Sequence, residues 1–248
     1  MTDPSDLNPT GRFSDRVEDY VKYRPTYPAA AVDCALGGAP RGAIVDVGAG
    51  TGIWTALLTA RGRAVIALEP NAQMRAAAPT LPGVTWQGGT AEATGLDDAS
   101  AALVTVAQAF HWFRANEALQ EFARVLVAHG RVALIWNRRS AGDPFTLGYR
   151  EAVLSVGAET AAERMPFDPG VFARSGVFDA PERHAFPHAQ ELDRAGLHGR
   201  ARSASYVPKT GPRAEELGAR LDALFDSYAA DGRVRLVYDC EVWRATRR

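Results

Sequence analysis

Three glycines follow a short apolar segment and stand two positions apart, at Gly48, Gly50 and Gly52 in the stretch IVDVGAGTG. Glycine has no Cβ atom, so a ligand can approach the backbone closely at such positions. An ordinary turn between a strand and a helix needs fewer glycines, so this spacing favours a ligand. An acid, Glu69, follows about 20 residues later, at the end of the next apolar run.

Small or polar residues also follow the later apolar runs. Thr90, Ala91 and Glu92 come after the third, Gln108 after the fourth and Asn137 after the fifth. In an open parallel sheet, ligands bind beyond the carboxyl ends of the strands. The sequence therefore predicts that the strands supply the framework and that their carboxyl ends supply the site.

Strand-like runs alternate with helical segments across the first half of the chain. Strands are predicted at 43–47, 64–68, 84–87, 101–108 and 131–137, and helices at 51–62, 71–79 and 116–127. Strict alternation predicts a parallel sheet with helices on both faces, and right-handed crossovers make it doubly wound.

The flanking segments follow other patterns. One short helix is predicted to end before Pro25, and a second to run from Pro28 to about Leu36. Residues 138–180 show no clear strand, and Pro187 favours an edge position for a strand at 182–188. A helix at 214–228 and a strand at 234–246 are predicted to complete the chain.

The composition excludes several classes of protein. The chain has 248 residues, of which 46% are hydrophobic, enough for one substantial core. Its net charge is −1, and no run of like charge indicates nucleic-acid binding. No apolar stretch reaches the roughly 18 residues of a membrane span, and the polar N-terminus lacks a signal-like apolar region. Together these two observations predict a cytoplasmic location. Cys34 and Cys240 fit no metal spacing, so we expect no metal, and two buried free thiols in a reducing cytosol are favoured over a disulfide.

Two classes of cofactor fit a glycine turn followed by an acid. The dinucleotide fingerprint is G-x-G-x-x-G, whose third glycine packs the helix against the strand. This chain has G-x-G-x-G, and Ile53 stands where that third glycine is required. The match to a nicotinamide site is therefore broken at a defining residue.

The stretch VDVGAGTG resembles the first motif, E/D-x-G-x-G-x-G, of class I S-adenosylmethionine-dependent methyltransferases. ALEPNAQM resembles their second motif, and GGTAEATGL resembles the segment that borders the adenine. AQAFHWF, EFARVLVAHGRVALIWN and YVKYRPTYP resemble a small-molecule subgroup typified by trans-aconitate methyltransferases, near the heteroaromatic N-methyltransferases of toxin and antibiotic pathways. VAHGR departs from the Pro-Gly-Gly of relatives, at a turn far from the cofactor. Each motif is weak alone, but together, in order, they are specific and cover most of the chain.

The resemblance implies a Rossmann-like fold with S-adenosyl-L-methionine as the cofactor and S-adenosyl-L-homocysteine as its product. Backbone N–H groups of the glycine turn would face the methionine carboxylate. Glu69 would hold two ribose hydroxyls, and Asp46 would either reach the cofactor amine through water or brace the turn. The cofactor-binding residues implied are Tyr20, Arg24, Asp46, Gly48, Ala49, Gly50, Gly52, Glu69, Pro70, Met74, Ala91, Glu92 and Gln108.

The acceptor side is predicted from the residues after the fourth and fifth strands. His111 is either a general base, since histidine titrates near neutral pH, or a structural histidine. Phe110, Trp112 and Trp136 would form an apolar wall for a flat substrate. Arg138 would meet an anionic substrate group.

The expected reaction is methyl transfer from S-adenosyl-L-methionine to an oxygen or nitrogen of a small molecule, a carboxylate or heteroaromatic metabolite. The alternatives are a nicotinamide-dependent oxidoreductase and a non-catalytic regulator that binds an adenosine cofactor. We expect no nucleic-acid or membrane partner, and a monomer or weak homodimer. The expected organisation is a disordered tail at 1–11 and one domain at 12–248, divided into a helical cap at 12–40, a cofactor-binding core at 41–137, a lid-like substrate region at 138–212 and a C-terminal helix and strand at 213–248.

Overall fold

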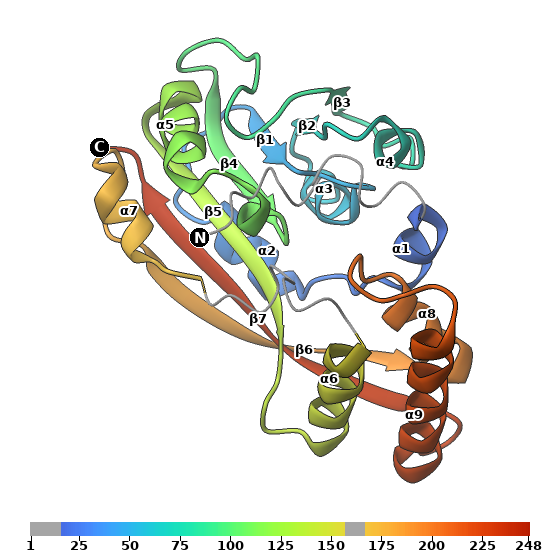
Figure 1. The fold of residues 1–248 in the computed structure, drawn as a ribbon. Helices are drawn as coiled ribbons and strands as arrows, with labels where there is room; N and C mark the ends of the chain where they lie inside the picture. Colours follow the sequence, from blue (N-terminus) through green and yellow to red (C-terminus); the bar gives the residue numbers. More distant parts are fainter. Residues whose placement is uncertain (1–15, 157–166) are drawn as a thin grey trace.

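The computed structural model describes residues 16–156 and 167–248, and its centre is a seven-stranded sheet (Figure 1). The strands are β1 (Ile44–Val47), β2 (Val65–Leu68), β3 (Val84–Gln87), β4 (Ala101–Ala107), β5 (Leu126–Arg139), β6 (Glu182–Leu192) and β7 (Val234–Thr246). They lie in the order β3-β2-β1-β4-β5-β7-β6. Strands β1 to β5 are parallel, and β7 runs antiparallel to both β5 and β6. The predicted α/β, doubly wound, Rossmann-like sheet with an antiparallel C-terminal strand is confirmed.

Helices follow most of the strands. They are α1 (Val17–Tyr23), α2 (Ala29–Leu36), α3 (Ile53–Thr59), α4 (Ala72–Ala76), the 3-10 helix η2 (Phe110–Trp112), α5 (Ala115–Val125), α6 (Pro144–Val156), α7 (Gly170–Ser175), α8 (Arg194–Arg202) and α9 (Pro212–Tyr228). Asn71 caps α4, because its side chain accepts hydrogen bonds from the N–H groups of Gln73 and Met74.

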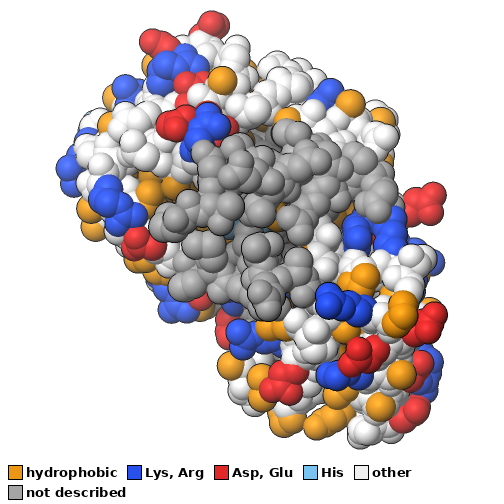
Figure 2. Space-filling view, viewed as in Figure 1, with side chains coloured by type: hydrophobic (Ala, Val, Ile, Leu, Met, Phe, Trp, Pro, Cys, Tyr) orange, Lys and Arg blue, Asp and Glu red, His pale blue; other side chains and the backbone are white. Residues whose placement is uncertain are grey.

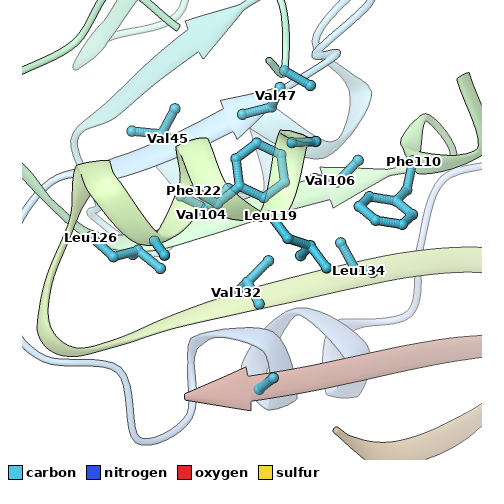
Figure 3. Close-up of a cluster of buried hydrophobic side chains, with 14 of the residues drawn as sticks. Val45, Val47, Val104, Val106, Phe110, Leu119, Phe122, Leu126, Val132 and Leu134 are labelled. Carbon is cyan, nitrogen blue, oxygen red and sulfur yellow. The ribbon is translucent and has the colours of Figure 1, made fainter. Parts of the chain in front are cut away.

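The alternating side chains of the central strands supply two hydrophobic clusters. Val45 and Val47 of β1 point toward α5, where they pack with Leu119 and Phe122 (Figure 3). Ile44 belongs to the cluster on the opposite face, which includes α2 and α3. Burial of both faces explains why β1 is apolar at three of its four positions and why Asp46 is conspicuous there.

A third hydrophobic cluster lies at the far end of β6 and β7. It joins α6, α8 and α9 through buried residues such as Tyr149, Leu197, Leu221 and Tyr238. Figure 1 shows these helices together at the lower end of the sheet, with α8 next to α1. The C-terminal half therefore extends the sheet and also builds a helical layer beside its carboxyl edge.

The sequence showed no clear strand in residues 138–180, and the structure has helices α6 and α7 there. The start of one strand differs from the sequence-based expectation. Strand β5 begins at Leu126, directly after α5, rather than at Arg131. His129 has a positive φ of 59°, and the register against β4 shifts between Ala101 and Leu103, so β5 absorbs its irregular start as a bulge.

The segment expected to form a lid, 138–212, also contributes the edge strand β6 to the sheet. Pro187 lies within this strand, which pairs with β7 alone among the described strands, and an edge position tolerates the missing N–H of proline. The tail expected at 1–11 lies outside the described residues. On the face shown in Figure 2, acidic and basic side chains are interspersed, in keeping with the near-zero net charge.

Replacing Phe122 tests the cluster in Figure 3. Its side chain is fully buried, so Phe122→Ala should lower the free energy of unfolding by about 3–5 kcal/mol in urea denaturation. The control is Val21→Ala, because Val21 is 50% exposed and its truncation should change stability by less than about 0.5 kcal/mol. Equal losses in the two variants would contradict this description of the core.

Candidate functional site

The glycine turn after β1 is held against the end of β2. The N–H groups of Gly48 and Ala49 both donate to the Leu68 carbonyl, with N···O distances of 2.8 and 3.0 Å. A Cβ atom on Gly48 would stand 2.7 Å from the Ala109 Cβ atom, and the φ angle of Gly48 is +68°. Glycine is therefore required at this position both by the left-handed backbone and by the close approach of the loop after β4.

Glu69, directly after β2, fixes the middle of the same turn. Its Oε2 atom accepts from the Gly50 N–H at 2.8 Å, and its Oε1 atom accepts from the Asn71 N–H at 2.9 Å. Burial raises the pKa of this carboxyl, while the two amide hydrogen bonds and nearby Arg75 act in the lowering direction. Each carboxylate oxygen keeps a further lone pair, so Glu69 can shape the turn and still accept from a ligand.

The expectation that amides of the turn face a ligand carboxylate is wrong for Gly48, Ala49, Gly50 and Gly52. Each of these N–H groups donates within the protein, the last to the Ala49 carbonyl at 2.9 Å. Gly52 is the left-handed N-cap residue of α3, and a Cβ atom on it would lie 3.1 Å from the Trp86 ring. The glycines thus act by admitting neighbours and ligand, rather than by presenting free donors.

A cavity of about 290 Å³ opens at the carboxyl ends of β1, β2 and β4. Its wall contains the predicted cofactor residues Tyr20, Gly48, Gly50, Glu69, Pro70, Met74, Ala91, Glu92 and Gln108. The wall also contains residues that the sequence analysis did not select as contacts, namely Val47, Gly89, Thr90, Ala107, Ala109, Phe113 and Arg114. Most of these adjoin the selected residues at a strand end, so extending each predicted contact by a residue or two would have found them.

A narrow cavity of about 30 Å³ adjoins the large one. Arg24, Asp46 and Ala49 line it, and Tyr20 and Gln108 line both cavities. The Arg24 guanidinium stacks over the Tyr20 ring, 4.7 Å from its centroid, and donates to the Ser203 carbonyl at 2.9 Å. Helix α1 therefore contributes one wall of the site and is tied to the segment after α8.

Gln108 occupies an uncommon backbone conformation at this junction. Its φ angle is +57°, and its N–H donates to the Ile135 carbonyl at 2.8 Å. A left-handed conformation is infrequent for residues other than glycine, asparagine and aspartate, and it concentrates at functional sites. The fold thus holds the Gln108 side chain at the boundary between the two cavities.

Asp46 braces the strand from within. It is 1% exposed, and its carboxylate oxygens accept from the hydroxyls of Thr55 at 2.6 Å and Thr105 at 3.0 Å. The register of β1 against β4 places Asp46 beside Thr105. Of the two roles considered from the sequence, bracing has direct hydrogen bonds in its favour.

Of the aromatic residues predicted to contact the acceptor, one lines the large cavity and two lie in the hydrophobic core. Trp112 lines the large cavity together with Glu69. Phe110 and Trp136 are each 4% exposed and belong to the hydrophobic core, with ring centroids 6.5 Å apart. The predicted apolar wall for the acceptor is therefore not formed by Phe110 and Trp136, because both rings are used in packing.

His111 and Arg138 line neither cavity. The His111 ring lies 4.9 Å from the Trp112 ring, measured between centroids. The Arg138 guanidinium lies over the Trp136 ring at 5.3 Å, and its Nε atom is 3.8 Å from a Glu241 carboxylate oxygen. Arg138 is thus engaged at the surface of the core.

The residues around the large cavity fit an adenosine cofactor. Glu69 offers carboxylate oxygens at the end of β2, where a ribose diol can donate to them. A Cβ atom on Gly50 would lie 3.5 Å from the Met74 Cε atom and 3.9 Å from the Tyr20 ring, all in the wall of this cavity. Glycine at this position therefore leaves room for a ligand against the backbone.

Two classes of feature are not found in residues 16–156 and 167–248. None of their helices has the length and apolar character needed to traverse a bilayer. Their His, Cys, Asp and Glu side chains form no group that could hold a metal ion. Cys34 and Cys240 are free thiols.

The buried Asp46 carboxyl should make stability depend on pH. Burial raises its pKa to about 7, against hydrogen bonds from Thr55 and Thr105 that lower it, and the Glu69 charge raises it further. Since the unfolded pKa is about 4, the native state binds more protons between about pH 4 and 7, and the free energy of unfolding contributed by Asp46 falls as pH rises through this window.

Asp46→Asn removes this titration. The difference in unfolding free energy, variant minus wild type, should increase from about pH 5 to about pH 8 in urea denaturation. The comparison cancels the other titrating groups, which both proteins share. A difference that stays constant with pH would show that Asp46 does not titrate in this window.

Comparison with known proteins agrees with this arrangement. Residues 45–134 match a family model described as a methyltransferase domain. An uncharacterized methyltransferase-like protein of Schizosaccharomyces pombe is 31% identical over 225 residues, which cover 86% of this chain and 85% of that protein. An uncharacterized methyltransferase of Mycobacterium tuberculosis is 44% identical over 131 residues, but the match spans only 51% of this chain and 52% of the relative.

Solved structures share the fold at lower identity. A structure assigned as a methyltransferase of an antibiotic biosynthesis pathway in Anabaena variabilis has a TM-score of 0.64 and 22% identity, covering 88% of this chain and 97% of that one. One assigned as a type II methyltransferase from Anaeromyxobacter dehalogenans has a TM-score of 0.63 and 22% identity, covering 91% and 98%. The match along most of the S. pombe protein, together with the motif-bearing cavity, establishes the family. The chain therefore belongs to the S-adenosylmethionine-dependent methyltransferase family.

Proposed function

We propose that this chain transfers a methyl group from S-adenosyl-L-methionine to an oxygen or nitrogen atom of a small-molecule acceptor, a carboxylate or heteroaromatic metabolite. The observation that carries the proposal is the buried Glu69 carboxylate, hydrogen-bonded to the Gly50 amide in the wall of a 290 Å³ cavity. Such a carboxylate beside a glycine turn suits the ribose hydroxyls of an adenosine group.

The lining residues suggest how the cofactor is held. Glu69 would accept from the ribose hydroxyls, with Met74 and Ala91 beside the adenine. Tyr20 and Gln108 line both cavities, so they would bound the passage from the ribose toward the methionine end. Arg24 lies at that end and carries the charge opposite to a carboxylate.

The bound cofactor supplies an electrophilic methyl group on a sulfonium centre. The task of the protein is then to place the acceptor atom in line with it and to exclude water, which can contribute up to about 10 kcal/mol in favourable cases. Gln108, fixed by its backbone hydrogen bond at the junction of the cavities, is suited to positioning. His111 lies in η2, which follows β4, next to Trp112 of the large cavity. It is the proposed base for an acceptor that must lose a proton.

Further parts of the proposal concern the acceptor class and the setting. The motif resemblance favours the subgroup of trans-aconitate and heteroaromatic N-methyltransferases, acting on small molecules in the cytoplasm as a monomer or weak homodimer. The mixed surface charge and net charge of −1 give no reason to expect a nucleic-acid partner.

Calorimetry with S-adenosyl-L-homocysteine and with NAD distinguishes the cofactor classes. We expect micromolar binding of the first and none of the second, since Ile53 stands in α3 where a nicotinamide site needs glycine. Binding of NAD alone would favour the oxidoreductase alternative. Transfer of a labelled methyl group to small carboxylates or heteroaromatic nitrogens then separates an enzyme from a regulator that only binds the cofactor.

Glu69→Ala should weaken S-adenosyl-L-homocysteine binding by roughly 1.5–3 kcal/mol, the range for hydrogen bonds to a charged group. Glu69→Gln should do less harm, because the amide oxygen still accepts, although one of the bonds to Gly50 and Asn71 is lost. The matched control is Glu216→Ala on the exposed face of α9. If both Glu69 variants bind as tightly as the control, Glu69 does not hold the ribose.

His111→Ala and Trp112→Ala should separate catalysis from cofactor binding. His111 lies outside the walls of both cavities, so its loss should leave S-adenosyl-L-homocysteine affinity within about threefold while kcat falls by roughly 10²-fold. Trp112 lines the large cavity, so its truncation should weaken cofactor binding by roughly 1–3 kcal/mol. An unchanged kcat in His111→Ala would assign His111 a structural role and favour an acceptor that needs no base.

A further inference from the structure

Arg200 is a cation buried beside the carboxyl edge of the sheet. It lies in the last turn of α8, and the residue is 4% exposed. Its Nε atom donates to the Tyr238 hydroxyl and its Nη1 atom to the Ser203 hydroxyl, both at the long distance of 3.3 Å. A guanidinium has five N–H donors, so these two weak bonds leave most of its capacity unused.

No ion pair offsets the charge of Arg200 among the described residues. The ionisable side chains with the largest influence on it are Tyr238, Tyr149 and Arg139. Those with the largest influence on Tyr149 are Arg200, Arg139, Tyr238 and Arg24. None of these is a carboxylate, and burying a cation without a counter-ion is costly.

Two neutral groups in the same place also have unused hydrogen-bonding capacity. Tyr149 is fully buried, and its hydroxyl has no hydrogen-bond partner among the described residues. The Nε2 atom of His188 is buried and likewise unpartnered within that set, while its ring stacks on Tyr238 at 6.0 Å. Burial lowers the pKa of His188, against a hydrogen bond to the Thr26 backbone that raises it, and burial raises the pKa of Tyr149, so both are neutral at pH 7. The single N–H of neutral His188 is used in the bond to Thr26, so its Nε2 atom is an acceptor, and the Tyr149 hydroxyl is the donor left without a partner.

This cluster lies directly behind the wall of the proposed methyl-transfer site. Arg24 lines the narrow cavity and donates to the carbonyl of Ser203, and the hydroxyl of the same Ser203 accepts from Arg200. Arg139 ends β5, and its guanidinium lies over the Tyr149 ring at 5.1 Å. The cluster thus sits where the carboxyl end of β5 meets α6 and α8, and Ser203 connects it to Arg24 in the wall of the narrow cavity.

The position of Arg200 in the last turn of α8 offsets only part of the free-energy cost of burying its charge. A helix C-terminus carries a partial negative charge, which stabilises a basic side chain there. That effect does not explain a fully buried tyrosine hydroxyl with nothing to bond to, nor the buried nitrogen of His188. A ligand that brings two acceptor oxygens would accept from the Arg200 guanidinium and from the Tyr149 hydroxyl.

We propose that Arg200, with the hydroxyl of Tyr149, binds a carboxylate group of the methyl acceptor. This inference rests on the proposed function and narrows it: the acceptor is an organic acid, and Arg200 and Tyr149 determine specificity by anchoring its anionic end. A guanidinium fork and a hydroxyl match the geometry of a carboxylate.

The test uses the full chain loaded with S-adenosyl-L-homocysteine and measures thermal unfolding. The probes are sodium benzoate and sodium acetate, with sodium chloride at equal ionic strength and neutral benzamide as controls. We expect a saturable rise in Tm with benzoate or acetate beyond the effect of chloride, because a ligand that binds only the native state stabilises it. No rise beyond chloride with either carboxylate would overturn the proposal.

Tyr149→Phe separates binding from folding. Removing an unpartnered buried hydroxyl should leave Tm in chloride unchanged or higher, yet raise the half-saturating concentration of the carboxylate roughly tenfold or more. Arg200→Met should abolish the carboxylate effect, whereas Arg220→Met and Tyr228→Phe, on the exposed side of α9, should keep it. A carboxylate response in Tyr149→Phe equal to that of wild type would contradict the assignment.

Two further measurements separate this inference from the proposed function. If the carboxylate effect occurs without S-adenosyl-L-homocysteine and is lost when that ligand binds, the site holds the cofactor's own carboxylate, which overturns the acceptor assignment. If calorimetry shows no S-adenosyl-L-homocysteine binding but the carboxylate effect remains dependent on Arg200, the proposed methyl transfer fails while the carboxylate site is supported.

Discussion

The contact between the Glu69 carboxylate and the Gly50 amide is the constraint on which the site depends. It joins the turn after β1 to the end of β2, and a second bond from Glu69 holds the start of the segment that leads into α4. A buried carboxylate is costly unless it is hydrogen-bonded, and here both of its oxygens are. The same carboxylate that orders the turn is then available to a ligand, so the shape of the cavity and its chemistry have one origin.

The parallel and antiparallel parts of the sheet support different parts of the site. The parallel strands β1 to β4 and their loops build the large cavity, and Asp46 and Thr105 brace it from inside the sheet. The antiparallel pair β6 and β7 packs with α6, α8 and α9 in a separate hydrophobic cluster. Arg24 connects the two halves, since it lines the narrow cavity and donates to Ser203. If the proposed carboxylate site is correct, the cofactor and the acceptor are held by different layers of one fold.

The sequence predicted the first half well for a physical reason. Glu69, the glycine turn and Gln108 directly follow strands that alternate in a regular pattern, so their common edge could be inferred without coordinates. The helices α6 and α8 and the cluster of Arg200, Tyr149 and His188 could not, because those residues are far apart in the chain and converge only through packing. Phe110 and Trp136 show the opposite error: aromatic residues near a strand end were taken for a substrate wall, but the core uses them.

The proposed cofactor site places a ligand against the backbone of Gly50. The most direct test compares Gly50→Val with Gly62→Val in calorimetry with S-adenosyl-L-homocysteine. Both glycines have left-handed φ angles, 59° and 70°, so both variants carry similar backbone strain, but a Cβ atom on Gly62 meets nothing within 4 Å. A ligand in contact with the Gly50 backbone predicts that Gly50→Val loses at least about 100-fold in affinity, about 2.7 kcal/mol, while Gly62→Val stays within about threefold of wild type. Equal affinities in the two variants would contradict it.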